Sequence, residues 1–119
     1  MHGHSRKKNV FIYGPYFPLH SDKYFKMRII PKLISEETIM FRYWSCKFRI
    51  EKSKERAARI ALWREFGIVN CYTLEASFHG FINNNRDTEE FTPEIFESIS
   101  ESVINSMYEY IIILEEEER

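Results

Sequence analysis

The sequence predicts an α/β fold, in which an open mixed sheet is flanked by helices. Apolar, β-branched runs alternate with segments of helical periodicity, and a long amphipathic segment follows near the C-terminus. The run from Ile68 to Leu74 is apolar on both faces, so it needs cover on both sides of the sheet. A chain of 119 residues supplies few helices for that cover. We therefore expect the chain to be part of a larger domain.

Composition narrows the class of protein further. Hydrophobic residues make up 44% and aromatic residues 16% of the chain, as is typical of a globular protein. The net charge of −1 and the short basic run Arg6-Lys7-Lys8 predict no general affinity for nucleic acid or acidic membranes. The longest purely apolar stretch, Ile111 to Leu114, is far shorter than the roughly 20 residues of a membrane span. Two cysteines are too few for a disulfide framework, which favours a reducing, cytoplasmic compartment.

The first third of the chain predicts a strand, a loop and an irregular helix. Val10 to Tyr13 is a short apolar run closed by Gly14-Pro15, which predicts a buried strand and a turn. Residues 15–24 are rich in aromatics and proline and predict a loop. Residues 22–34 have near-helical spacing, but Pro31 predicts that this helix is broken.

The middle of the chain predicts a strand, a helix and a second strand. Phe41 to Ile50 alternates as a strand does, with a bulge near Ser45. Lys54 to Phe66 favours a helix that stops at Gly67. Ile68 to Phe78 is apolar and β-branched, and predicts a central strand.

The last third predicts a loop over residues 79–91, with a polar tip at residues 83–87, and then a helix over residues 92–113. Thr92 suits the N-cap and Pro93 the first helical position. The predicted apolar stripe of this helix consists of Ile95, Phe96, Ile99, Val103, Met107 and Ile111.

Glu75 and the N-terminal histidines are the candidates for chemistry. Glu75 lies near the C-terminal edge of an apolar strand, where an unpaired carboxylate is costly to bury and where α/β folds place ligands. The alternative is an ordinary glutamate that is satisfied or faces solvent. His2 and His4 suit zinc as neutral imidazoles, or they belong to a mobile terminus, a cloning scar or the middle of a cut domain.

Three segments, in order, resemble one protein family. Residues 2–11 begin His2-Gly3-His4-Ser5 and resemble the His-Gly-His-Ser stretch of the cytosolic carboxypeptidases. Residues 70–78 resemble that family's Asn-Ser-Tyr-Thr-Leu-Glu-Ala-Ser-Phe stretch, with Cys71 in place of serine. Residues 52–65 resemble its Lys-Glu-x-Thr-Ala-Arg and Trp-Arg stretch. The resemblance runs from residue 2 to the final helix and implies a partial carboxypeptidase-like fold.

The resemblance also implies roles for four residues. His2 matches the third zinc ligand of the family, and Glu75 matches the catalytic glutamate, which takes a proton from a water molecule. Arg59 and Lys54 become candidates for binding the acidic side chain of the departing residue, because such a carboxylate needs a cation. Both also suit a solvated helix face, and Ala57 replaces the family's usual threonine beside them.

Other parts of the family's site are absent from the sequence. Its remaining two zinc ligands come from a His-x-x-Glu, and none of the four histidines here is followed by Glu at that spacing. The arginine that grips the substrate's terminal carboxylate also precedes this region in the family. We therefore expect residues 1–119 to be the C-terminal portion of a catalytic domain, with Met1 an artificial or alternative start, and to be inactive alone.

The implied function is that of a zinc metallocarboxypeptidase which removes C-terminal glutamates from polyglutamylated proteins such as tubulin. The implied location is cytoplasmic, at microtubules or cilia. Two alternatives remain open: a non-catalytic remnant or binding module of the same ancestry, and an unrelated small α/β module.

Overall fold

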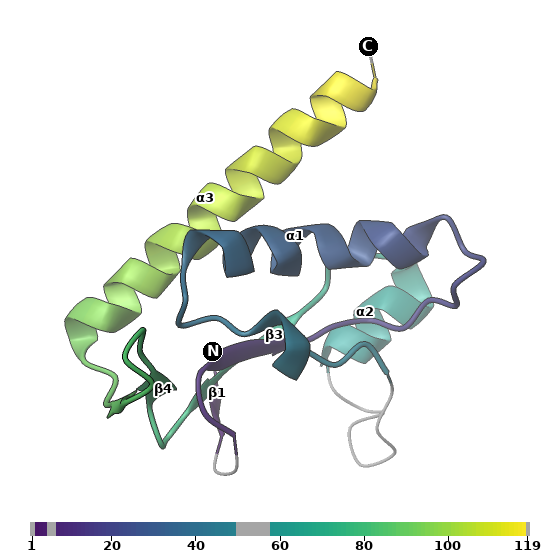
Figure 1. Cartoon of the computed structure of the whole chain (residues 1–119). Coiled ribbons are helices and arrows are strands. Elements are labelled where there is room, and N and C mark those ends of the chain that lie inside the picture. The colour runs from purple at the N-terminus through teal and green to yellow at the C-terminus, as the bar shows by residue number, and fades with distance from the viewer. Residues whose placement is uncertain (1, 5–6, 50–57, 119) are drawn as a thin grey trace.

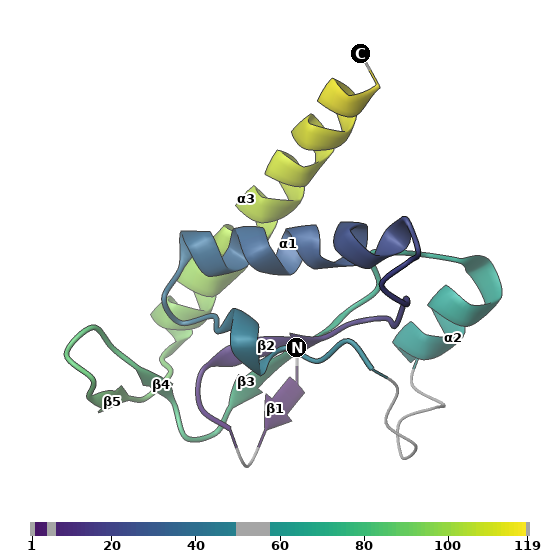
Figure 2. The ribbon, with the colours of Figure 1, turned by 45° about the vertical axis from the view of Figure 1, so that its right-hand side comes forward.

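Three short strands form the main sheet of the computed structural model, which describes residues 2–4, 7–49 and 58–118, with backbone alone at residues 2, 4, 58 and 59. The strands are β1 (His2–His4), β2 (Val10–Tyr13) and β3 (Thr73–Ser77). Their order is β1-β3-β2, with β1 parallel and β2 antiparallel to β3. The sheet is therefore mixed, and β3 is its interior strand, as predicted (Figures 1 and 2).

Two long helices lie on the same side of this sheet. α1 (Lys23–Glu37) crosses above the strands, and α3 (Pro93–Glu117) crosses α1 at an angle (Figures 1 and 2). A third helix, α2 (Ala58–Phe66), lies near the N-terminal end of α1. The core between the sheet and the two long helices contains Val10, Ile12, Ile30, Ile34, Phe41, Ala76, Ile99 and Tyr110. The predicted α/β class is confirmed.

α1 is one continuous helix, so the prediction of a broken helix is wrong. Pro31 lies inside the helix and is buried. Its missing N–H leaves the carbonyl oxygen of Met27 without a helical partner. The hydroxyl of Tyr72 donates a hydrogen bond to that oxygen over 2.7 Å. A partner from elsewhere in the chain thus offsets the bond that proline removes.

The segment predicted as a strand from Phe41 to Ile50 is not one. Phe41 and Lys47 form isolated bridges to β2, and a 3₁₀ turn, η1 (Tyr43–Ser45), lies between them. The amide of Arg42 donates to the carbonyl of Val10 over 2.8 Å, and the amide of Lys47 donates to that of Ile12 over 3.0 Å. Only the two ends of the segment follow the edge of β2, because the turn lifts the middle away. Residue 50 lies outside the described residues.

The predicted helix from Lys54 to Phe66 is confirmed over Ala58–Phe66, while residues 54–57 lie outside the described part of the chain. Gly67 ends it as expected, at a φ of +66° and with its amide donating to the carbonyl of Trp63. The strand that follows is shorter than the predicted range of Ile68 to Phe78. Tyr13, the last residue of β2, pairs with Thr73, so residues before Thr73 have no neighbouring strand there.

The predicted loop over residues 79–91 contains a small hairpin of β4 (Phe81–Ile82) and β5 (Thr88–Glu89). The side-chain oxygen of Asn83 accepts hydrogen bonds from the amides of Asn85 and Asp87, at 2.9 and 3.0 Å. The polar tip is therefore a closed turn, and the two strands at its base are too short to give a periodic signal.

α3 starts as predicted and runs to Glu117. The hydroxyl of Thr92 accepts a hydrogen bond from the amide of Ile95 over 3.2 Å, and Pro93 is the first helical residue. Within the described residues, no helix is long and apolar enough to cross a membrane. The predicted apolar stripe is wrong in its C-terminal half, since Met107 and Ile111 are about half exposed. Ile99 of the predicted stripe is buried, and the other buried residues of α3 are Ser102, Ser106 and Tyr110.

Small polar residues can occupy the buried side of α3 because they are satisfied locally. The hydroxyl of Ser106 donates to the carbonyl of Ser102 over 2.8 Å, and that of Ser102 donates to the carbonyl of Ser98 over 3.2 Å. Each serine thus buries little surface and leaves no free donor. A pattern of apolar residues alone does not reveal such a face.

Candidate functional site

Glu75 lies at the middle of the interior strand and on the side of the sheet away from the helices. Its neighbours Leu74 and Ala76 pack with the core, and side chains alternate along a strand, so Glu75 belongs to the opposite face. The residue is only 8% exposed. Within the described residues, its carboxylate has no hydrogen bond or ion pair. The residue is largely buried, but its carboxylate oxygens are not among the fully buried side-chain atoms that lack a hydrogen-bond partner in the described residues.

His2 is the register partner of Glu75 in the neighbouring strand. β1 runs parallel to β3, and the Cα partners are His2 with Glu75, Gly3 with Ala76 and His4 with Ser77. Register partners share a face of the sheet, so positions 2 and 75 lie side by side on one face. The structure describes only the backbone at position 2. The expectation that both side chains enter one cleft therefore stays a prediction.

Gly3 lies against the ring of Phe78, the residue that follows β3. A β-carbon at position 3 would meet the far end of that ring, and Phe78 is 75% exposed, so its side chain has room to move aside. The contact makes residues 3 and 78 direct neighbours but does not by itself require glycine at position 3.

Asn9 joins the elements around these strands, and sequence reasoning missed it. Asn9 is 1% exposed and has a φ of 71°. Its amide donates to the carbonyl of Gly80 over 2.8 Å, and its carbonyl accepts from the amide of Ser77 over 3.1 Å. Its side-chain oxygen also accepts from the amide of Ile82 over 3.3 Å. The available signal was an asparagine directly before an apolar run, since asparagine tolerates positive φ.

The two predicted substrate-binding residues are placed only in part. Lys54 lies outside the described residues. Arg59 is the second residue of α2, and only its backbone position is described. Their proposed role therefore stays a prediction.

The residues described do not form a complete metal site. Over residues 2–4, 7–49 and 58–118, no group of three His, Cys, Asp or Glu side chains could hold a metal ion. Catalytic zinc sites normally use three protein ligands. The chain offers one candidate ligand beside one candidate base, and its sequence contains no His-x-x-Glu that could supply two more.

Comparison with known sequences identifies the relatives of the chain. It is 38% identical over 110 residues to cytosolic carboxypeptidase 2 of Xenopus tropicalis and 36% identical over 114 residues to cytosolic carboxypeptidase 3 of Mus musculus. Each match covers 92% of this chain. The chain is a homologue of a segment of the cytosolic carboxypeptidases. It spans 11% of the length of these two relatives. No protein-family model matches it.

The fold agrees with this relationship. The structure superposes on a metallo-carboxypeptidase from Burkholderia cenocepacia with a TM-score of 0.70, covering 91% of this chain and 28% of that one. The two sequences are 15% identical, so the likeness concerns the fold alone. The predicted partial carboxypeptidase-like fold is confirmed.

The cytosolic carboxypeptidase motifs named above meet in the sheet. Residues 2–11 supply β1 and the start of β2, and residues 70–78 supply β3, which lies between those two strands. Two segments about 60 residues apart in this cytosolic carboxypeptidase homologue are therefore direct neighbours. His2 and Glu75 lie opposite each other where β1 of the first segment pairs with β3 of the second.

Proposed function

We propose that this chain supplies part of the active site of a zinc metallocarboxypeptidase, with Glu75 as the general base and His2 as one metal ligand. The observation that carries the proposal is the register of positions 2 and 75 on one face of adjacent parallel strands. The location of Glu75 on the interior strand, where the residue is only 8% exposed, supports the same assignment. Homology to the cytosolic carboxypeptidases supports the class of enzyme.

Glu75 is chemically suited to the role of base. Its carboxylate would accept a proton from the water molecule that attacks the scissile carbonyl and would then give that proton to the leaving amine. A zinc ion, when bound, would make that water acidic enough for a carboxylate to deprotonate. The interior strand holds Glu75 by ladders on both sides, which fixes its position better than a loop would.

The proposed substrates are glutamate-rich C-terminal tails of proteins such as polyglutamylated tubulin, met in the cytoplasm at microtubules or cilia. The resemblance of residues 52–65 to the family supports Arg59 and Lys54 as cations for the glutamate side chain. The relatives are named cytosolic carboxypeptidases, which agrees with the proposed compartment and reaction class.

The isolated chain is proposed to be inactive. One imidazole holds zinc too weakly to keep it beside Glu75, because the sequence lacks the His-x-x-Glu that would complete the ligand set. The second candidate is a non-catalytic binding module of the same ancestry.

A complemented protein, in which an upstream segment supplies His-x-x-Glu, separates the two candidates. We expect the 119-residue chain to release no glutamate from a glutamate-tailed peptide, with or without added zinc. The complemented protein should release it, and its Glu75→Gln variant should not. Zinc-dependent turnover by the 119-residue chain would overturn the proposal that this chain is inactive alone. Full activity of the Glu75→Gln variant would overturn the assignment of Glu75 as the general base.

A further inference from the structure

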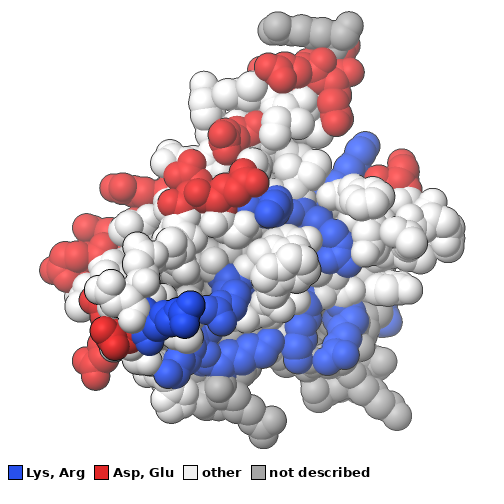
Figure 3. All heavy atoms as spheres, viewed as in Figure 1, with Lys and Arg blue, Asp and Glu red and all other residues white. Residues whose placement is uncertain are grey.

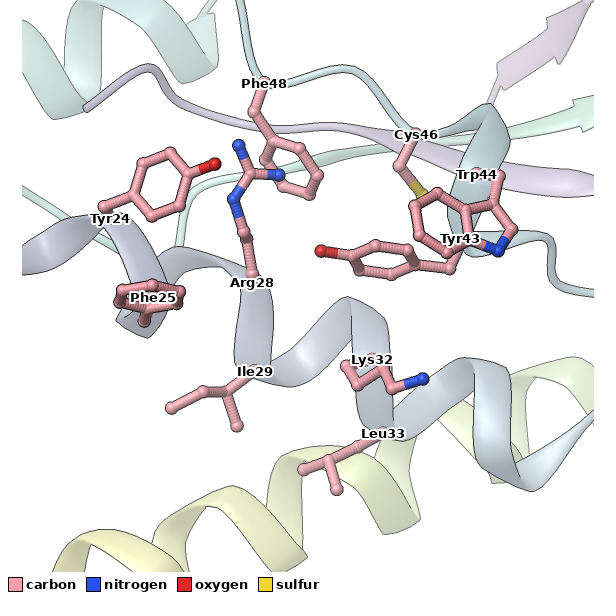
Figure 4. Close-up of a pocket in the computed structure, with 10 residues that line it drawn as sticks. All are labelled: Tyr24, Phe25, Arg28, Ile29, Lys32, Leu33, Tyr43, Trp44, Cys46 and Phe48. Atoms are coloured by element: carbon pink, nitrogen blue, oxygen red, sulfur yellow. The ribbon is translucent and has the colours of Figure 1, made fainter. Parts of the chain in front are cut away.

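A hollow of about 600 Å³ lies between α1 and the segment from Tyr43 to Phe48. We call it the Arg28 hollow (Figure 4). Its α1 side consists of Tyr24, Phe25, Arg28, Ile29, Lys32 and Leu33. The opposite side consists of Tyr43, Trp44, Cys46 and Phe48. Most of these side chains are apolar or aromatic, so the half-buried Arg28 and the exposed Lys32 lie beside an apolar wall.

The guanidinium of Arg28 is held between two aromatic rings but has a nitrogen without a hydrogen-bond partner. Its guanidinium carbon lies 4.4 Å from the ring centroid of Tyr24 and 4.2 Å from that of Phe48, so the group is clamped between two rings (Figure 4). Its Nε atom is buried and has no hydrogen-bond partner in the part of the chain that the structure describes. The buried Nε is out of reach of a ligand, but the Nη atoms at the outer end of the clamped guanidinium can donate to an acceptor in the hollow, and this planar group matches a carboxylate.

The charge around the Arg28 hollow is of one sign. A neighbouring hollow of about 440 Å³ shares Arg28, Cys46 and Phe48 with it and adds Lys47 and Arg49. Among the described residues, no Asp or Glu lines either hollow. Figure 3 shows Lys and Arg gathered on this face, while Asp and Glu gather over α3. A chain with a net charge of only −1 has thus separated its charges, and this face would attract an anion.

The rim of the Arg28 hollow is aromatic and open. Trp44 is 89% exposed and Phe25 is 68% exposed. Large exposed aromatic side chains beside an arginine are the residue types that dominate contacts with protein partners. A small inorganic anion would leave this apolar wall uncovered, so the ligand must combine a carboxylate with apolar side chains. A nucleic acid would need more cations than these few.

We propose that the Arg28 hollow binds an acidic peptide segment of a partner protein, with a glutamate or aspartate carboxylate on Arg28 and an adjacent apolar or aromatic side chain against Trp44 and Phe25. Lys32 and the cations of the neighbouring hollow attract the remaining acidic residues of the segment. This binding involves internal side chains of the peptide and no terminal carboxylate, so it is independent of the proposed carboxypeptidase activity.

The test measures binding of the 119-residue chain to a fluorescent peptide of alternating glutamate and phenylalanine, acetylated at one end and amidated at the other. Blocked ends remove the terminal carboxylate that a carboxypeptidase would recognise. We expect saturable binding that weakens as salt rises, because part of it is electrostatic. A peptide with glutamine in place of each glutamate should bind at least about tenfold more weakly.

Variants of the chain assign the site. Arg28→Met keeps an apolar stem between the two rings and removes the fork, and should weaken binding at least about tenfold. Trp44→Ala should weaken it about fivefold or more. Lys26→Met is the matched control, because it removes an equal charge from the exposed side of α1 and should change affinity less than about threefold. Circular dichroism confirms that each variant stays folded.

Three results would overturn the proposal. The first is equal affinity for the glutamate and glutamine peptides. The second is a loss in Arg28→Met no larger than that in Lys26→Met. The third is a concentration-dependent dimer of the chain, detected by sedimentation, that Trp44→Ala abolishes, because a second copy would then cover the hollow.

Discussion

The hydroxyl of Tyr72 donates a hydrogen bond to the carbonyl oxygen of Met27, the acceptor that Pro31 leaves free in α1. This bond ties the approach to β3 to the middle of the helix above it. Burial raises the pKa of the Tyr72 hydroxyl, so the group remains a protonated donor at ordinary pH. Tyr72 therefore helps to hold the strand that carries Glu75, three residues further along, beneath α1.

Removal of this hydroxyl should cost stability without disturbing packing. Tyr72→Phe keeps the ring but leaves the Met27 carbonyl oxygen unsatisfied, so the free energy of unfolding should fall by about 1–3 kcal/mol. Urea denaturation followed by circular dichroism measures the loss. Tyr108→Phe removes a hydroxyl from a residue that is 66% exposed and should leave the midpoint unchanged. Equal midpoints for the two variants would show that the Tyr72 bond does not stabilise α1.

Substitution of Asn9 should lower the stability of the fold more than Tyr72→Phe does, because both the backbone conformation and the side-chain hydrogen bond of Asn9 contribute. Asn9→Ala loses the hydrogen bond that the amide of Ile82 donates to the side-chain oxygen, and it replaces an asparagine, which tolerates a φ of 71°, with a residue that disfavours it. Together these should lower the free energy of unfolding by about 2–4 kcal/mol. Asn9→Gly tolerates the positive φ and should lose about half as much. Thermal unfolding of both variants would test this order, with Asn84→Ala at the exposed hairpin tip as the control.

Signals that depend on local chemistry predicted the structure well. The cap at Thr92, the proline at position 93 and the glycine at position 67 each act through backbone groups one turn away, and each prediction is confirmed. The apolar run of β2 is buried at all four positions, as its composition indicates. In such cases the sequence neighbours of a residue determine its conformation.

Predictions failed where a distant residue decides the outcome. Pro31 does not break α1, because Tyr72 compensates from 41 residues away. Phe41 to Lys47 alternates like a strand, yet only its ends can follow a β2 strand of four residues. The location of Glu75 in an interior strand could be predicted, since its flanking residues are apolar. Its pairing with position 2 depends on the sheet order and required the family resemblance or the structure.

Cys46 should be chemically inert in the folded chain. Burial raises its pKa from 9.0 to about 12, although a hydrogen bond from the amide of Ile12 and the charges of Lys7 and Arg28 act in the opposite direction. The reactive thiolate is therefore nearly absent at pH 8. In a Cys71→Ser variant, which leaves Cys46 as the single cysteine, iodoacetamide should label the native chain far more slowly than the urea-unfolded chain. Equal rates would contradict the burial of this thiol.

The same shift has a consequence for stability at high pH. Below pH 9 the Cys46 thiol is protonated in both states. Between about pH 9 and 12 the unfolded chain releases this proton while the folded chain keeps it, so stability falls as pH rises. The decline should be shallower in a Cys46→Ala variant when urea midpoints are compared across that window. A decline of the same slope in both chains would assign the effect to other groups.

The assignment of His2 as a metal ligand gives a prediction that does not depend on turnover. In the complemented protein, His2→Ala removes one of three expected ligands and should weaken zinc affinity by at least about a hundredfold, as measured by competition with a chromophoric chelator. His4 is the matched control, because it lies two residues along the same strand but pairs with Ser77 rather than Glu75. His4→Ala should therefore retain zinc affinity.

Glu75→Gln should also retain zinc affinity while abolishing glutamate release, because a base is needed for proton transfer but not for holding the metal. If His4→Ala lost zinc and His2→Ala did not, the ligand would be His4 and the register of β1 with β3 would differ from the one described. If Glu75→Gln lost zinc as well, Glu75 would be a ligand and the base would have to be another residue.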